Sequence, residues 1–304
     1  MIATLPVALA VFAAAAQSVS EPPLENLLAR LAEEAAAFRA AAPNVIAEET
    51  LTHRARRRPA RFRPRIGSSA QPTPPPFETR KIVSEYGFAV LGVPPGALHE
   101  ARQVVSVDGR RVASAGSARR RLIEGMSSPD DRVKRRLLEP FERLGLRDVA
   151  ADFGPALLLF EKSAQANFEF RWSGRRKIGA EETLGCAFRQ TRATSIGLTI
   201  FEPKRMLRVP LEGVIWVRET DMLPVRIEFT VRRTHDNTTI RDEAAVDYAL
   251  SPHGVLLPVS VVHRQFAGDL MVVENLFQYS AFRRFGAQTE IRFPESPPEP
   301  DREP

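Results

Sequence analysis

The chain has a single cysteine, Cys186, among its 304 residues. One cysteine excludes an intramolecular disulfide framework and a cysteine-based zinc site. We expect Cys186 to be a buried and unreactive thiol, because no histidine or cluster of bases flanks it to lower its pKa. The mean hydropathy is −0.21, and no second long apolar run follows the N-terminal one. These absences argue against a protein with several membrane spans.

The sequence also lacks the motifs of the common catalytic sites. HExxH, GxSxG, the P-loop, GxGxxG and CxxC are all missing. No two of the five histidines lie two to four residues apart, so no local metal motif exists. Adjacent strand residues face opposite sides, so we interpret the pairs His99–Glu100 and His235–Asp236 as surface residues, and Glu48–Glu49 has no support as a catalytic pair. The sequence therefore predicts no catalytic residue, metal or cofactor.

The N-terminus has the form of an export signal. Residues 2–16 are almost entirely apolar and end in small residues, with Ala14 and Ala16 before Gln17. This run is short for a bilayer core of about 30 Å and resembles a secretory signal peptide, although no Lys or Arg precedes it. We expect cleavage after Ala16 and a periplasmic or secreted protein. An uncleaved anchor and a core helix are the alternatives.

The first mature segment is an amphipathic helix. Apolar residues recur at helical spacing over residues 22–42, with prolines at its start and Pro43 after its end. A strand is predicted over residues 44–56. The apolar stripe of the helix consists of Leu24, Leu27, Leu28, Leu31, Ala35 and Phe38.

An arginine- and proline-rich insertion follows at residues 56–77. Its composition is typical of a solvated loop. A second interpretation is a docking patch for an anionic surface such as lipid headgroups. Nucleic acid is not an expected partner, because no base-stacking motif accompanies the basic residues. The candidate docking residues are Arg56, Arg57, Arg58, Arg61, Arg63 and Arg65.

The rest of the chain is mostly β. We expect strands at 79–91 and 99–107, a helical stretch at 117–145, and strands from Leu157 onward, with a turn at Ser173-Gly174. Alternation in Pro224–Arg233 places Val225, Ile227, Phe229 and Val231 on one face, which indicates a sheet with one dry and one wet side. The predicted fold class is α+β: a strongly curved antiparallel sheet, an incomplete barrel, wrapped over a few helices. Residues 22–293 form one domain, with a short last strand at 288–293, and residues 294–304 a disordered tail.

Three segments together resemble the lipoprotein-localisation-factor superfamily, the LolA/LolB-like periplasmic carriers. They are the N-terminal helix with its strand, the hairpin GVIWVRETDMLPVRIEF with Gly213, Trp216, Leu223, Pro224 and Arg226, and the strand pair around SPHGVLLPVSV. The resemblance implies an incomplete antiparallel barrel closed by helices, holding acyl chains in the hollow. The insertion at 56–77 and the helical stretch at 117–145 depart from that pattern, and no residue role is transferred.

We interpret the chain as a non-enzymatic binding or carrier protein for lipid, acylated protein or another apolar ligand. The alternatives are an envelope interaction protein with a filled core, which docks through the Arg-rich loop, and an enzyme with a dispersed site. Plain core packing is the first interpretation of each candidate cavity residue and a cavity wall the second, and Trp216 and Phe229 are allowed to face different sides. The candidates are Leu28, Phe38, Phe168, Phe170, Trp172, Trp216, Ile227 and Phe229.

Overall fold

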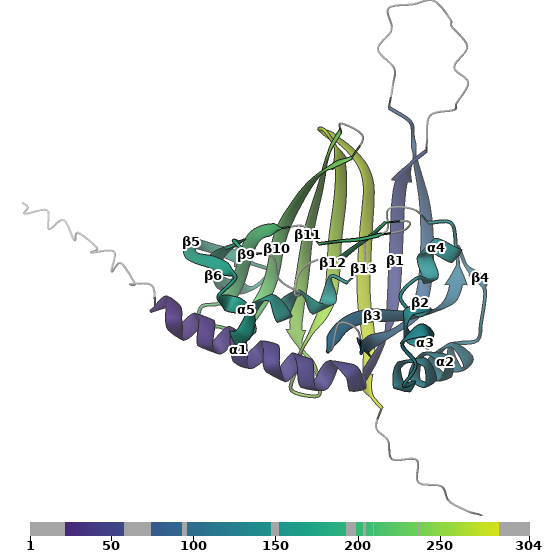
Figure 1. Cartoon of the computed structure of the whole chain (residues 1–304), viewed down its shortest axis with the longest axis horizontal. Coiled ribbons are helices and arrows are strands. Elements are labelled where there is room, and N and C mark those ends of the chain that lie inside the picture. The colour runs from purple at the N-terminus through teal and green to yellow at the C-terminus, as the bar shows by residue number, and fades with distance from the viewer. Residues whose placement is uncertain are drawn as a thin grey trace, which may run out of the picture.

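The chain is built on one large open sheet with helices on both of its faces (Figure 1). The computed structural model describes residues 22–57, 74–92, 96–146, 152–192, 199–202, 205–208, 210–235 and 238–285. The expected signal peptide, most of the arginine-rich insertion, the strand expected at 288–293 and the C-terminal tail lie outside these residues. Among the described helices, none combines the length and the apolar character needed to span a membrane.

Eleven antiparallel strands form the main sheet, in the order β4-β3-β2-β1-β13-β12-β11-β10-β9-β6-β5. The sheet is curved and not closed into a barrel, which confirms the predicted fold class. A separate hairpin is made by β7 (Thr199–Glu202) and β8 (Arg205–Arg208). The strands of the main sheet are β1 (Val45–Arg56), β2 (Phe77–Leu91), β3 (Ala97–Val107), β4 (Arg110–Arg111), β5 (Phe168–Ile178), β6 (Glu181–Gln190), β9 (Leu211–Arg218), β10 (Pro224–His235), β11 (Thr238–Leu250), β12 (Leu256–Ala267) and β13 (Leu270–Arg284).

Helix α1 (Leu24–Ala41) packs on the face that we call the inner face of the sheet. Its buried residues Leu27, Leu31, Ala35 and Phe38 are four members of the predicted stripe, and they confirm the expected helix. The apolar stripe is sufficient to predict both the helix and its buried face, because a helix that packs on a sheet buries one side and leaves the other in water. Three short elements contact α1. They are η1 (Ala42–Asn44), which follows α1 directly, η2 (Gly154–Phe160) and α5 (Lys162–Gln165).

The helical stretch expected at 117–145 is divided into three pieces: α2 (Ala115–Ser127), α3 (Asp131–Arg135) and α4 (Pro140–Arg143). Pro140 begins α4 because its ring cannot continue a preceding helix. Leu122 and Met126 of α2 share a second, smaller core with Ala89 and Ala101. Strands β2 and β3 are therefore covered on both faces. In the described part of the chain, no helix shares an apolar core with the outer face of β9–β12.

Two expectations about the middle of the chain were wrong. Residues from Leu157 do not begin a strand, because 154–160 form the 3₁₀-helix η2. Ser173-Gly174 is not a turn: β5 continues through it with a bulge after Trp172, where Gly174 takes a φ of +98°. A bulge needs one extra residue with unusual backbone angles, so glycine satisfies it as well as it satisfies a turn.

Candidate functional site

The inner face of the sheet carries a continuous row of apolar side chains across eight strands. Antiparallel pairing places each of them directly opposite the next, from β6 at one end to β2 at the other. All eight are at most 1% exposed and belong to the main core. The row consists of Cys186, Ile215, Ile227, Val246, Val261, Phe277, Leu51 and Ile82.

The hollow of this face is filled by η2, which is an apolar segment of the chain itself. Its sequence is GPALLLF, and every residue except Pro155 is buried. Runs of 3₁₀-helix longer than three or four residues are uncommon because their hydrogen bonds have poor geometry. We call residues 152–161 the plug, because they occupy the space between the sheet and α1.

Polar contacts hold the plug at its two ends and at Leu157. The Tyr248 hydroxyl donates to Gly154 O at 2.9 Å and accepts from Leu157 N at 3.2 Å. At the other end, Arg39 of α1 pairs with Glu161. Burial raises the pKa of Tyr248 well above its ordinary value, so its proton is available for the bond to Gly154. Most of the remaining contact is between apolar side chains.

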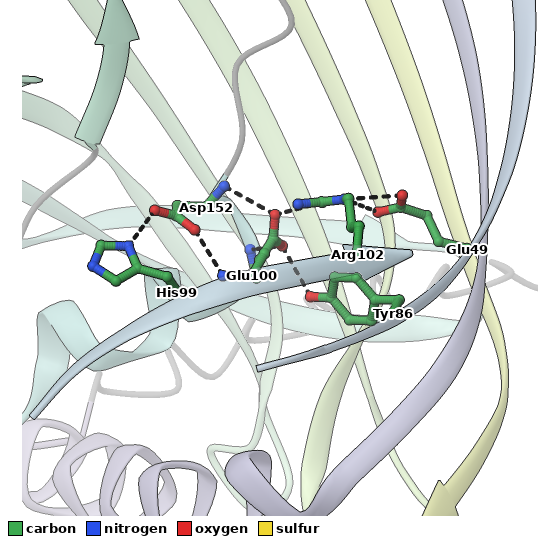
Figure 2. Close-up of polar contacts among 7 residues, drawn as sticks. Glu49, Tyr86, His99, Glu100, Arg102 and Asp152 are labelled. Atoms are coloured by element: carbon green, nitrogen blue, oxygen red, sulfur yellow. Dashed lines mark hydrogen bonds and ion pairs between the residues drawn. The ribbon is translucent and has the colours of Figure 1, made fainter. Parts of the chain in front are cut away.

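The start of the plug meets a cluster of buried charges (Figure 2). Arg102 donates from Nε to both carboxylate oxygens of Glu49, at 2.9 and 2.8 Å, and from Nη2 to Glu100 at 2.6 Å. None of these three side chains is exposed. The other carboxylate oxygen of Glu100 accepts from Gly154 N at 2.8 Å and from the Tyr86 hydroxyl at 2.9 Å.

The two glutamates of this cluster differ in acidity. Burial raises the pKa of Glu49 to about 7, against the opposing charge of Arg102. Burial also acts on Glu100, but the charge of Arg102 and the hydrogen bonds from Arg102, Gly154 and Tyr86 outweigh it and lower the pKa. The pKa of Arg102 is raised, because the two carboxylates outweigh its burial. Glu49 is therefore the group of this cluster that can exchange a proton near neutral pH.

Asp152 ties the plug to the edge of β3. One of its carboxylate oxygens accepts from Glu100 N at 2.8 Å, and the other lies 2.6 Å from His99 Nδ1. His99 and Glu100 are 6% and 1% exposed, so their interpretation as surface residues was wrong. The reason is that the plug covers this part of β3, where sequence alternation alone shows no partner. The side chains of the other pair, His235 and Asp236, lie outside the described part of the chain.

A second buried polar chain crosses the inner face nearer the other end of the strands. His53 Nδ1 lies 2.7 Å from Asn275 Oδ1, and Asn275 Nδ2 lies 3.0 Å from His263 Nδ1. His263 Nε2 continues to Asp242 Oδ1 at 3.0 Å. The Phe153 ring of the plug packs on His263, with ring centroids 5.0 Å apart. Such fully connected polar groups can be buried at low cost, so this chain explains why polar residues interrupt the apolar face.

The predicted cavity residues fall into three groups. Phe38, Phe168, Ile227 and Phe229 are buried in the main core, around the plug or the sheet beneath it. Leu28, Phe170 and Trp172 are half-buried and pack against that core from its border. These seven residues share the inner side of the molecule.

Trp216 lies on the opposite face, so its expected place in an inner cavity was wrong. It alternates with Ile215 and Val217, which belong to the inner core. Its ring stacks on Arg176, whose Cζ is 4.0 Å from the ring centroid, and its Nε1 donates to Glu228 at 3.0 Å. Gly185 makes room for the ring, because a Cβ there would lie 2.7 Å from it.

The candidate docking arginines are only partly within the described residues. Arg56 donates to Met271 O and Pro75 O and stacks on Phe77, and Arg57 lies 3.6 Å from Glu78. Arg58, Arg61, Arg63 and Arg65 fall outside the described residues.

Sequence reasoning missed the residues that hold the plug. Arg102, Asp152 and Tyr248 come from β3, a loop and β11, so no local motif unites them. One signal was present: a strand that carries Glu100 and Arg102 two residues apart places both charges on one face. The sequence alone could not show that this face is buried.

Comparisons with known proteins give distant structural likenesses. No family model and no curated protein matches the chain. An outer membrane lipoprotein-sorting protein domain from Vibrio parahaemolyticus has a TM-score of 0.36 at 12% identity, over 88% of this chain and 94% of that one. A DUF1329 family protein from Desulfovibrio piger has 0.34 at 9%, over 85% and 90%. A LolA superfamily protein from Nitrosomonas europaea has 0.32 at 9%, over 85% and 94%.

Proposed function

We propose that this chain is a periplasmic, non-enzymatic binding or carrier protein that holds an apolar ligand, such as an acyl chain, on the inner face of its sheet. The observation that carries the proposal is the plug. The apolar segment η2 fills a hollow that is lined by apolar side chains, and the sheet forms hydrogen bonds to it at Gly154 and Leu157.

An apolar guest could take the place of the leucine and phenylalanine side chains of η2, whereas the polar contacts of Asp152 and Gly154 with β3 would stay in place. A bound acyl chain would cover the same apolar side chains of the sheet that η2 covers, so this part of the core would stay dry. The exchange is permitted because the hydrophobic effect depends on area and not on direction. The polar contacts at the two ends of the plug would keep the displaced segment attached to β3 and α1.

The test is ligand binding to the mature chain purified under native conditions. Lipid extraction with mass spectrometry identifies what copurifies, and a fluorescent fatty acid reports on binding to the delipidated protein. Acyl chains present at about one per protein, or saturable probe binding, support the proposal. A ligand-free protein that does not bind the probe overturns it.

A pair of tyrosine variants tests the role of the plug. Tyr248→Phe removes two of the hydrogen bonds from the sheet to η2 and leaves the bond from Gly154 N to Glu100. It should raise the affinity for the probe severalfold, because the plug then competes less well. Tyr279→Phe is the matched control: Tyr279 is also a buried inner-face tyrosine, but within the described residues its hydroxyl makes no hydrogen bond to the plug. Equal effects of both variants would contradict displacement of the plug.

A further inference from the structure

The outer face of the sheet is lined with arginines that are matched by carboxylates. Arg226 binds Asp247 with two donors, at 2.5 and 3.1 Å. Arg54 and Arg264 share Glu274, at 2.6 and 3.0 Å. Comparable pairs join Arg176 to Glu228, Arg189 to Glu169 and Arg232 to Glu212. On the outer face, the charges of these arginines are therefore largely balanced by carboxylates.

The excess positive charge of the chain is concentrated in two segments. Residues 56–77 hold six arginines and no acidic residue. Residues 110–146 hold ten lysines and arginines against five acidic residues, a difference of +5, whereas the whole chain has a net charge of +6. Most of this segment is α2, α3 and α4, together with the two-residue edge strand β4. This second basic segment lies at the end of the sheet that carries β3 and β4 (Figure 1).

Some cations of this segment hold it on the sheet. Arg119 donates to both carboxylate oxygens of Glu85, at 3.1 and 2.8 Å, and Lys134 donates to Val90 O at 2.7 Å. Ser114 caps α2 by accepting from Ser117 N. Helix α2 is therefore fixed in place by contacts on its buried side.

Other cations of β4 and α2 point into solvent. Arg110, Arg111, Arg120 and Arg121 are exposed, and none forms an ion pair within 4 Å in the part of the chain that the structure describes. Val112 lies between them in sequence and is 61% exposed, which is unusual for an apolar side chain of its size in this chain. We call these five residues the β4–α2 surface.

We propose that the β4–α2 surface docks on a layer of anionic lipid headgroups. Arginine binds phosphate with two donors at once, and cations near an anionic membrane add to one another without needing fixed partner positions. Val112, which follows Arg111 in the sequence, adds one exposed apolar side chain. A protein partner would need a larger anchor, typically an aromatic pocket or side chain, and this surface has neither.

Vesicle flotation tests the proposal. The full chain should bind vesicles that contain phosphatidylglycerol, bind phosphatidylcholine vesicles weakly, and lose binding as salt screens the charges. The variant Arg110→Gln/Arg111→Gln/Arg120→Gln/Arg121→Gln should reduce binding at least about tenfold, because each cation near the surface contributes. Thermal unfolding should be unchanged, since these side chains are exposed.

Matched variants make the outcome specific. The control Arg175→Gln/Lys177→Gln/Arg189→Gln/Arg232→Gln removes the same charge from cations that already face carboxylates, and it should retain binding. Equal loss in both variants would overturn the proposal, because net charge alone would then explain binding. Loss only on deletion of residues 58–73, equal binding to both vesicle types, or binding to acidic proteins without vesicle binding would overturn it as well.

Discussion

Arg102 Nε donates to both carboxylate oxygens of Glu49, in an ion pair with no solvent exposure between β3 and β1. Two carboxylates and one guanidinium share this site, so Glu100 is matched by the same cation. Aromatic rings surround the guanidinium: its Cζ lies 5.3 Å from the centroid of Tyr86, 5.2 Å from that of Phe141 and 5.6 Å from that of Phe277. The Arg102 guanidinium, which binds the Glu100 that contacts the plug, is thus surrounded by aromatic side chains.

Removal of Arg102 should be severely destabilising. Arg102→Met leaves Glu49 and Glu100 buried without a cation, and breaking a buried ion pair costs about 3–5 kcal/mol. Urea unfolding followed by circular dichroism measures the change in the free energy of unfolding. Arg189→Met is the control, because Arg189 pairs with Glu169 at 2.6 Å but both side chains are more than 60% exposed, and such a pair contributes little to the free energy of unfolding. Similar destabilisation by the two variants would show that burial does not set the strength of the Arg102 cluster.

The stability of the chain should fall as pH rises towards neutrality, and Glu49 should be a cause. The folded protein keeps the Glu49 proton up to about pH 7, whereas the ordinary pKa of a glutamate, expected in the unfolded chain, is 4.5. Between these values the folded state binds more protons, so raising the pH lowers the free energy of unfolding. The lowered pKa of Glu100 acts in the opposite direction, and only on acidification below this window.

Glu49→Gln tests this dependence, because glutamine stays uncharged. The variant should gain stability relative to the wild type as the pH is raised from about 5 to about 8. Urea titrations at both pH values give the two differences. Glu48→Gln, at the exposed neighbouring position, is the control and should show a constant difference. A constant difference for Glu49→Gln as well would show that Glu49 does not titrate in this range.

The elements with a clear period could be predicted from the sequence. Alternation in β10 placed Val225, Ile227, Phe229 and Val231 on one face. The structure buries the last three and leaves Val225 half-buried, where the register shifts between Pro224 and Arg226. Helical spacing did the same for α1. In both cases polar residues mark the wet side, so the pattern itself carries the information.

The sequence was uninformative where apolar residues are consecutive. Leu157, Leu158 and Leu159 have no period, and a short apolar run suits a strand or a helix equally. Trp216 stands between Ile215 and Val217, so β9 has apolar side chains on both faces. The partners of Trp216 on the outer face are Arg176 and Glu228, which lie on other strands. The local sequence pattern of β9 therefore does not show which face Trp216 takes.

A close backbone approach makes Gly213 a sensitive position. A Cβ at this residue would lie 2.0 Å from Glu228 O and 2.8 Å from the Phe188 ring. Gly213→Ala should therefore destabilise the protein by about 1–3 kcal/mol or more, as overpacking does. Gly116→Ala in the exposed first turn of α2 meets nothing within 4 Å and should be neutral or slightly stabilising. Thermal unfolding of both variants compares them, and an unchanged midpoint for Gly213→Ala would show that β9 can move away from β10.

The two tryptophans lie on opposite faces of the sheet and can report where a ligand binds. Trp172 pairs with Cys186 and packs against the inner core, whereas Trp216 is stacked under Arg176 on the outer face. The chain has no other tryptophan. An acyl chain that carries bromine quenches fluorescence on contact, so an inner-face ligand should quench Trp172 and spare Trp216.

Single-tryptophan variants separate the two signals. Trp216→Phe, which keeps Trp172, should show much weaker emission when the brominated fatty acid binds. Trp172→Phe, which keeps Trp216, should change little, and the unbrominated fatty acid should leave both variants bright. Quenching of Trp216 alone would place the ligand on the outer face, where a groove of about 320 Å³ runs between Val214, Ala245 and Val262. That result would contradict displacement of the plug, because the plug lies on the inner face and the sheet separates the two faces. The protein would still bind an apolar ligand, but at a different site.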